Sequence, residues 1–281
     1  MHIITNSIFI IERKSIMKRR NKSAGKLTIR TKNFIALLKR VHLGGIIEDA
    51  VAVVNGKKCY IEAVDLSNNL VVVTSATISK QKSNELELGL GGIDSLIKFF
   101  GTIKEPVINT SLSENKLIFI RKDKRRQMKY LLSDPSMIAT VLDKDDPEED
   151  TAELFRGMQE YKVVLTREVI QDFHSYVGLS KSKTTEVAYD GSEITITIGS
   201  DIEHQFSITI DGEVEDVDGN GENIILKVNG DFLDKVLSTI EIDEENPPQL
   251  WIGDSKPVLI TDSETIWALL PSAEGETEEE E

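Results

Sequence analysis

Apolar residues follow two different spacings along the chain. In segments such as residues 193–198, every second residue is apolar, which is typical of a strand with one buried face. In four other segments, apolar residues recur every three or four positions, which is typical of an amphipathic helix. The expected helices begin near Thr31, Ile93, Thr166 and Gly230. Helices of this kind beside mostly antiparallel strands predict the α+β fold class.

The same order of elements occurs twice, so we expect two duplicated domains. Each half predicts a strand, a helix, three strands, a strand leading into a second helix, and three closing strands. The matching segments are 31–38 with 166–173, 55–56 with 190–191, and 94–103 with 231–240.

The strands of each half follow from the alternating pattern. Thr31 and Thr166 are expected to cap their helices, because a threonine hydroxyl satisfies a free backbone amide. The strands expected in the first half include residues 26–30, 49–54, 59–64, 70–75 and 137–142. Those expected in the second half include residues 162–165, 185–189, 194–198, 204–210 and 265–270.

An acidic segment separates the two halves. Residues 143–160 carry eight acids and two bases, contain Pro147 and show no strand pattern, so they predict an extended connector. The predicted organisation is a disordered basic extension at 1–25, a first domain at 26–142, the connector at 143–160, a second domain at 161–271 and an acidic tail at 272–281.

The two ends of the chain carry opposite charge. The chain holds 33 basic and 48 acidic residues, a net charge of −15. Residues 1–30 nevertheless hold eight bases and one acid, and residues 272–281 hold six glutamates and no base. Both ends therefore predict solvated tails, and Met17, which precedes three bases, is a second candidate start. A negative net charge does not exclude nucleic-acid binding, because one face of the protein can still be basic.

No catalytic, cofactor or metal site is expected. The sequence has no nucleophile elbow, no zinc-protease motif and one cysteine, Cys59, which favours a reducing compartment. Residues 216–221 match the first half of a calcium loop, but Lys227 stands where the loop requires a glutamate. No apolar run of about 18 residues is present, so no membrane span is expected.

The outward faces of the predicted helices carry bases in both halves. One interpretation is an ordinary solvated face, and the other is contact with nucleic-acid phosphates. The bases are Lys32, Lys39, Arg40, Lys98, Arg167 and Lys235, and Gln171 and His174 are expected on the outward face of the third helix. The basic segment 121–126 predicts a solvated turn, or a further contact with nucleic acid.

Two short motifs add to the duplicated pattern. Glu-Ala-Val-Asp-Leu at 62–66 follows a strand, and Ile-Trp-Ala-Leu-Leu-Pro at 266–271 precedes the acidic tail. With these residues, the chain resembles, over about 27–271, the sliding DNA clamps of the proliferating cell nuclear antigen type and their phage counterparts. Leu270 stands where that family has alanine. This divergence favours a viral or phage clamp.

The resemblance implies a non-enzymatic processivity factor for DNA replication. Three copies would close a homotrimeric ring around double-stranded DNA, and the outward bases of its helices would contact phosphates without reading sequence. By analogy, the last strand of the first domain would pair with a strand of the second domain in the next copy. The implied interface residues are Met137, Ile138, Thr140 and Leu142 on one side and His204, Phe206, Ile208 and Ile210 on the other.

The resemblance also implies a docking site for short peptides of DNA polymerase, the clamp loader and other replication proteins. Apolar residues in an acidic connector favour such a groove, or else they fix the connector to the sheet. The matching positions are Val64, Leu66, Leu154, Phe155, Pro257, Ala268 and Leu269. The implied location is the cytoplasm, that of the host for a phage protein, or the nucleus for a eukaryotic or eukaryotic-viral protein.

A second hypothesis is a monomeric, clamp-like polymerase accessory or adaptor that does not encircle DNA. Both hypotheses use the same fold, so the state of assembly distinguishes them.

Overall fold

The computed structural model describes residues 26–79, 83–113, 116–120, 127–140, 151–180, 184–199, 204–219 and 221–272. These residues form two compact units. The first unit contains residues 26–64 and 74–140, and the second contains residues 65–73 and 151–272. The expected extension at 1–25, the basic segment 121–126, connector residues 143–150 and tail residues 273–281 lie outside the described residues.

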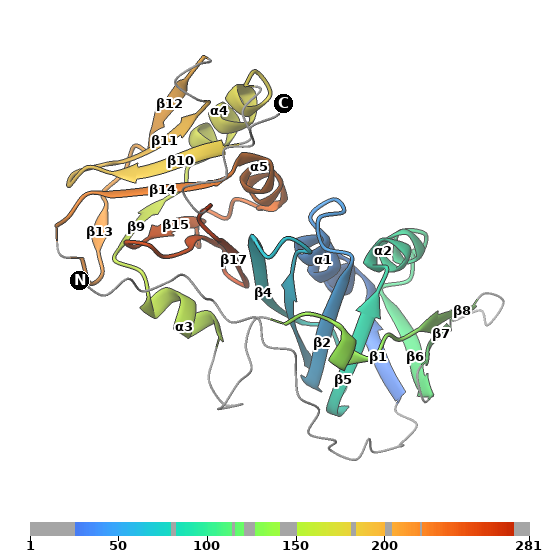
Figure 1. Cartoon of the computed structure of the whole chain (residues 1–281). Coiled ribbons are helices and arrows are strands. Elements are labelled where there is room, and N and C mark those ends of the chain that lie inside the picture. Colours follow the sequence, from blue (N-terminus) through green and yellow to red (C-terminus); the bar gives the residue numbers. More distant parts are fainter. Residues whose placement is uncertain are drawn as a thin grey trace, which may run out of the picture. The chain divides into compact units, whose positions relative to one another are not determined.

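In the first unit, two helices lie beside two groups of antiparallel strands (Figure 1). One sheet has the order β1-β6-β7-β8, and another run of strands has the order β4-β3-β2-β5. Residues 74–77 of β4 belong to the first unit, and residues 70–73 are counted with the second. The elements are β1 (Lys26–Arg30), α1 (Thr31–His42), β2 (Asp49–Gly56), β3 (Lys58–Val64), β4 (Leu70–Thr77), β5 (Ser83–Gly91), α2 (Ile93–Gly101), β6 (Val107–Ser113), β7 (Lys116–Ile120), β8 (Gln127–Leu131) and the short 3₁₀ helix η1 (Pro135–Met137).

The second unit repeats this arrangement. One sheet has the order β12-β11-β10-β14, and a second run has the order β13-β9-β15-β16-β17. The elements are α3 (Thr151–Gly157), β9 (Tyr161–Val164), α4 (Arg167–Val177), β10 (Thr184–Tyr189), β11 (Ile194–Ile198), β12 (Phe206–Thr209), β13 (Glu215–Asp216), β14 (Ile224–Asn229), α5 (Gly230–Thr239), β15 (Gln249–Ile252), β16 (Val258–Thr261) and β17 (Thr265–Leu269).

The predicted α+β fold class is confirmed. Strands β1 and β11 begin and end where the alternation predicts, and helix α5 begins at Gly230, as the helical spacing predicts. In β11 the isoleucines are buried and the threonines between them are half-buried, as the two-residue period requires.

An aromatic cluster lies at the centre of the first unit. Phe100 of α2 meets Phe34 of α1 and Phe119 of β7 edge to face, with ring centroids 5.1 and 5.0 Å apart. All three side chains are buried. In the second unit, every residue of β16 and β17 is buried, including Trp267. Each helix pair is therefore fixed to its sheets by its apolar face.

The strand expected at 137–142 is absent from the residues of that segment that the structure describes. Met137 ends the 3₁₀ helix η1, and Ile138 and Thr140 lie outside strands. The reason is local turn chemistry: Pro135 stands at the first helical position, and the Asp134 carboxylate accepts a hydrogen bond from the Ser136 amide at 3.1 Å. Leu142 lies outside the described residues. The last described strand of this unit is β8.

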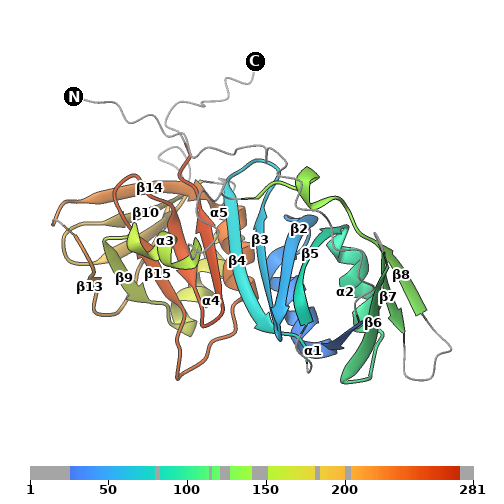
Figure 2. The ribbon, with the colours of Figure 1, turned by 90° about the horizontal axis from the view of Figure 1, so that it is seen from below.

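The extended connector is also corrected, since residues 151–157 form the helix α3. Thr151 and Phe155, four residues apart, are its buried residues, so this short helix has one buried face. Figure 2 shows α3 over the strands β9 and β15 of its own unit. The acid-rich composition concealed this short apolar period.

One of the two predicted threonine caps is present. Thr166 caps α4, its hydroxyl accepting a hydrogen bond from the Val169 amide at 3.3 Å. Thr31 is instead buried, and its hydroxyl donates to the carbonyl of Glu105 at 2.7 Å. The α1 N-terminus therefore has no side-chain cap.

Among the described residues, no helix has both the length and the apolar character needed to cross a lipid bilayer.

Replacing Phe100 with alanine is expected to destabilise the first unit by about 3–5 kcal/mol, because it leaves a cavity in the aromatic cluster. Cys59, the single cysteine, is buried in β3, and burial raises the pKa of its thiol to about 12. The folded unit therefore protects this thiol from alkylating reagents near neutral pH. The loss of stability is measured by the rate at which Cys59 is labelled in denaturant, which should be higher in the Phe100→Ala chain.

Ser95→Ala on the exposed face of the same helix is the matched control and should label like the parent chain. Both tryptophans, Trp251 and Trp267, lie in the second unit, so their emission follows that unit separately. Equal labelling of the Phe100→Ala and Ser95→Ala chains would contradict the central role of Phe100.

Candidate nucleic-acid interface

Helix α1 presents a basic face. Phe34, Leu37, Leu38 and Val41 are among the residues buried on one side of the helix. Lys32, Ala36 and Lys39 are exposed at positions that the helical period places on one stripe. Arg40 is half-buried at the flank of this stripe and interacts within the structure. No acidic residue occurs in α1, so the charged residues of its exposed face are all basic.

Helix α2 contributes a neutral pair. The Lys98 Nζ lies 2.6 Å from Asp94 Oδ2, one helical turn away. The hydrogen bond from Lys98 to the Asp94 carboxylate, with the negative charge of that group, raises the pKa of the Lys98 ammonium. Lys98 is therefore exposed, as expected, but its charge is already compensated.

Helix α4 carries acids beside its predicted base. Arg167 and Gln171 are exposed as the sequence indicates. Glu168 and Asp172 are exposed on the same helix. These two carboxylates are residues that the sequence analysis missed, because it counted only the bases of each outward face.

His174 does not point freely outward. Its side chain is half-buried, and its Nδ1 lies 2.6 Å from the Oδ1 of Asp234 on α5. This contact joins α4 to α5 and occupies one ring nitrogen of the predicted DNA-binding histidine. No local pattern could reveal it, since the partner lies 60 residues away in the chain.

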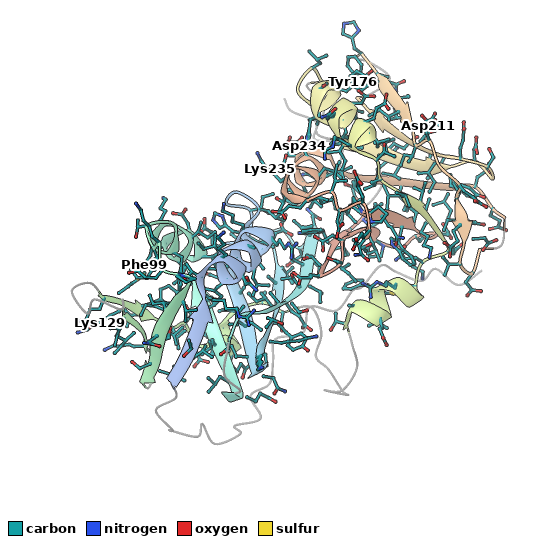
Figure 3. The ribbon with its side chains drawn as sticks, turned by 180° about the vertical axis from the view of Figure 1, so that it is seen from behind. Phe99, Lys129, Tyr176, Asp211, Asp234 and Lys235 are labelled. Carbon is teal, nitrogen blue, oxygen red and sulfur yellow. The ribbon has the colours of Figure 1, made fainter. Side chains whose placement is uncertain are left out.

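Helix α5 carries two acids beside Lys235. Lys235 is exposed, and Asp231 and Asp234 lie on the same side of the helix. Figure 3 shows Asp234 and Lys235 together on this helix. The α1–α2 pair is therefore basic, whereas the α4–α5 pair has more acids than permanent bases.

Two strands form outer edges of the four-stranded sheets. Among the described strands, β8 is the last in β1-β6-β7-β8, and β12 is the first in β12-β11-β10-β14. Strand β12 contains Phe206 and Ile208, whereas His204 and Ile210 flank it. Phe206 stacks on Tyr176 of α4, with ring centroids 5.0 Å apart and planes 13° apart.

The edge at β8 was missed by the sequence analysis, although its pattern carries a signal. Gln127, Lys129 and Leu131 are exposed, whereas Met128 is half-buried and Tyr130 is buried. This is the two-residue period of a strand with a polar outer face. Leu131 is the apolar residue of this exposed face, and its side chain is 62% exposed.

Of the seven predicted peptide-contact residues, Leu66 is the most accessible at 98% exposure. The Asp65 carboxylate holds its turn: it accepts hydrogen bonds from the amides of Ser67, Asn69 and Leu70 at 2.9, 2.7 and 2.6 Å, and one from the Ser67 hydroxyl. Asp65 itself is buried. Leu66 is thus presented on a fixed turn.

The other predicted contact residues are less accessible. Val64 and Leu154 are half-buried, and Phe155 and Pro257 are buried. Ala268 and Leu269 are 0% and 1% exposed, so their side chains offer no surface to a partner in this structure.

No group of three or more histidine, cysteine, aspartate or glutamate side chains within the described ranges has the geometry to hold a metal ion. The buried Cys59 thiol, with its raised pKa, lacks the environment of a nucleophile.

Comparison with known proteins identifies the fold. No protein-family model matches the chain, and no curated protein matches it. Among solved structures, the complex described as the C-terminal region of FEN-1 bound to A. fulgidus PCNA matches with a TM-score of 0.66 and 14% identity, over 90% of this chain and 100% of that chain.

Two further structures agree. The proliferating cellular nuclear antigen of Entamoeba histolytica matches with a TM-score of 0.64 and 10% identity, over 88% of this chain and 98% of that one. The PCNA of Thermococcus kodakaraensis matches with a TM-score of 0.64 and 15% identity, over 88% and 99%. The chain therefore has the fold of the proliferating cell nuclear antigen sliding clamps.

Proposed function

We propose that this protein is a sliding DNA clamp, a non-enzymatic factor that closes as a homotrimeric ring around duplex DNA and tethers replication proteins. The observation that carries the proposal is the match to PCNA structures over 88–90% of the chain, which includes both duplicated units. The exposed bases of α1 support it, because contacts to phosphates alone bind DNA without regard to sequence.

Ring closure is proposed between the edge strand β8 of one copy and the edge strand β12 of the next. An edge strand leaves backbone groups free for pairing, and natural proteins usually protect or use such edges. Exposed or half-exposed apolar side chains flank both edges: Leu131 on β8, and Phe206 with Tyr176 beside β12. This assignment replaces residues 137–142 with β8, since Met137, Ile138 and Thr140 lie outside strands.

A peptide-docking role is proposed for the surface around Leu66. An apolar side chain exposed on a fixed turn is suited to anchor a short apolar motif. The complex of A. fulgidus PCNA with the C-terminal region of FEN-1 supports this mode of partner binding in proteins of this fold.

The proposed ring predicts both a trimeric mass and a topological hold on DNA. We expect a native mass near three times 31.4 kDa at micromolar concentration. Chains that thread onto a linear duplex, whose ends are then blocked by streptavidin, should resist removal by high salt, because the ring is held by topology. Cutting that duplex should release them.

A monomeric mass, together with loss from the blocked duplex in high salt, would refute the ring and leave the monomeric adaptor as the function.

The proposed interface predicts a loss of assembly when a charge is placed on the edge of β8. Leu131→Lys should weaken ring assembly at least about tenfold, because it places a charge in an apolar interface. The matched control is Ile225→Lys, since Ile225 is a strand residue of similar exposure, 65% against 62%. Native mass as a function of concentration gives both assembly constants. Equal behaviour of the two variants would exclude β8 as the interface.

The proposed docking surface predicts weaker peptide binding when Leu66 is replaced. Leu66→Ser should lower the affinity for a fluorescent peptide of the FEN-1 C-terminal region about tenfold or more, since burial of a leucine side chain contributes about 1.5–3 kcal/mol. Leu179→Ser, at a side chain that is 68% exposed beyond α4, is the control and should bind like the parent chain. Fluorescence anisotropy measures all three chains. Undiminished binding by Leu66→Ser would remove Leu66 from the docking surface.

A further inference from the structure

The two helix pairs differ in the sign of their charge. Helices α1 and α2 carry four permanent bases and one acid, whereas α4 and α5 carry two permanent bases and four acids. Duplicated elements that serve one polyanion equally would be expected to carry similar charge. The difference therefore bears on which helices touch DNA, an inference that rests on the proposed clamp function.

In the first unit, the attractive charge is concentrated on α1. Lys32 and Lys39 are both exposed, about two turns apart on one stripe, and neither forms a salt bridge with a described residue. The small side chain of Ala36 lies between them, so it does not obstruct a phosphate backbone that approaches this stripe. Lys98 on α2 is already paired with Asp94.

In the second unit, acids accompany each base. Glu168 follows Arg167 directly, and both are exposed. Asp231 lies one turn before Lys235, at a spacing that brings opposite charges together. The carboxylate of Asp234 is bonded to His174.

The chain beyond α5 is also acidic. Exposed acids follow the helix at Glu241, Asp243, Glu244 and Glu245. The last turn of α5 contains no base to offset them.

We infer that α1, through Lys32 and Lys39, supplies the backbone-phosphate contacts of the clamp, and that the α4–α5 face repels the duplex. A trimer of two-unit chains then alternates three attractive positions with three repulsive ones around its hole. The duplex is drawn toward one α1 at a time, and few ionic interactions must break for it to move. This arrangement follows from charge alone and requires no recognition of bases.

The test compares two matched double variants, each of which removes two exposed helix bases. Lys32→Gln with Lys39→Gln removes those of α1, and Arg167→Gln with Lys235→Gln removes one each from α4 and α5. Binding of a short fluorescent duplex is titrated from about 50 to about 200 mM salt. The slope of log K against log salt changes by about 0.9 for each phosphate that the protein no longer neutralises.

The α1 variant should bind more weakly than the parent chain, with a shallower slope, by up to about 1.8 per chain that touches the duplex. The Arg167 and Lys235 variant should keep the parent slope. An equal decrease of affinity in both variants, or a larger decrease in the second, would overturn the inference.

A gain-of-affinity variant tests the repulsion directly. Glu168→Gln with Asp172→Asn should tighten duplex binding at low salt, and the gain should shrink as salt screens the charges. Unchanged affinity at low salt would show that the α4–α5 face does not repel the duplex and would overturn that part of the inference.

The native mass of each variant separates this inference from the proposed function. If the variants are trimers and the two double variants lose the same duplex affinity, the α1 assignment is refuted and the clamp function stands. Monomers that still lose duplex affinity through Lys32 and Lys39 would refute the ring and leave the α1 assignment standing. Cys59 labelling in the native state checks that the first unit of each variant remains folded, and tryptophan emission checks the second unit.

Discussion

The structure depends on the burial of one apolar face of each helix pair against its own sheets. In the first unit this burial is centred on Phe100, which contacts both α1 and β7. Once the apolar faces of α1 and α2 are buried, the helical period leaves their polar faces exposed. The same holds for α4 and α5, where Phe173 and Val236 are buried. The candidate DNA surface is thus a geometric consequence of core packing.

Much of this fold could be predicted from the sequence because its strands and helices have clear periods. Residues 194–198 alternate strictly, and residues 230–239 bury residues three and four apart, so both elements were located correctly. The predictions fail where turn chemistry or a residue distant in the chain determines the local structure. Pro135 and the Asp134 carboxylate form a 3₁₀ turn just before apolar residues that otherwise suit a strand.

The residues of the candidate site divide in the same way, into those whose direction follows from the helical period and those that depend on a distant partner. The outward direction of Lys32 and Lys39 follows from the helical period and is present in the structure. The orientation of His174 depends on Asp234, which reaches it only after α4 and α5 have packed together. The acids of α4 and α5 were visible in the sequence all along, but their meaning required a comparison of corresponding faces. Charge must therefore be counted per face, with both signs, before a basic surface is assigned.

The turn that carries Leu66 has a consequence for the entropy of association. Ordering a flexible loop when a partner arrives opposes binding, at about 0.5–1.5 kcal/mol for each side chain immobilised. Here the Asp65 carboxylate already fixes the backbone from Ser67 to Leu70, so that ordering has occurred during folding. A partner that docks at Leu66, as proposed above, would therefore gain this contact at little further cost in backbone freedom.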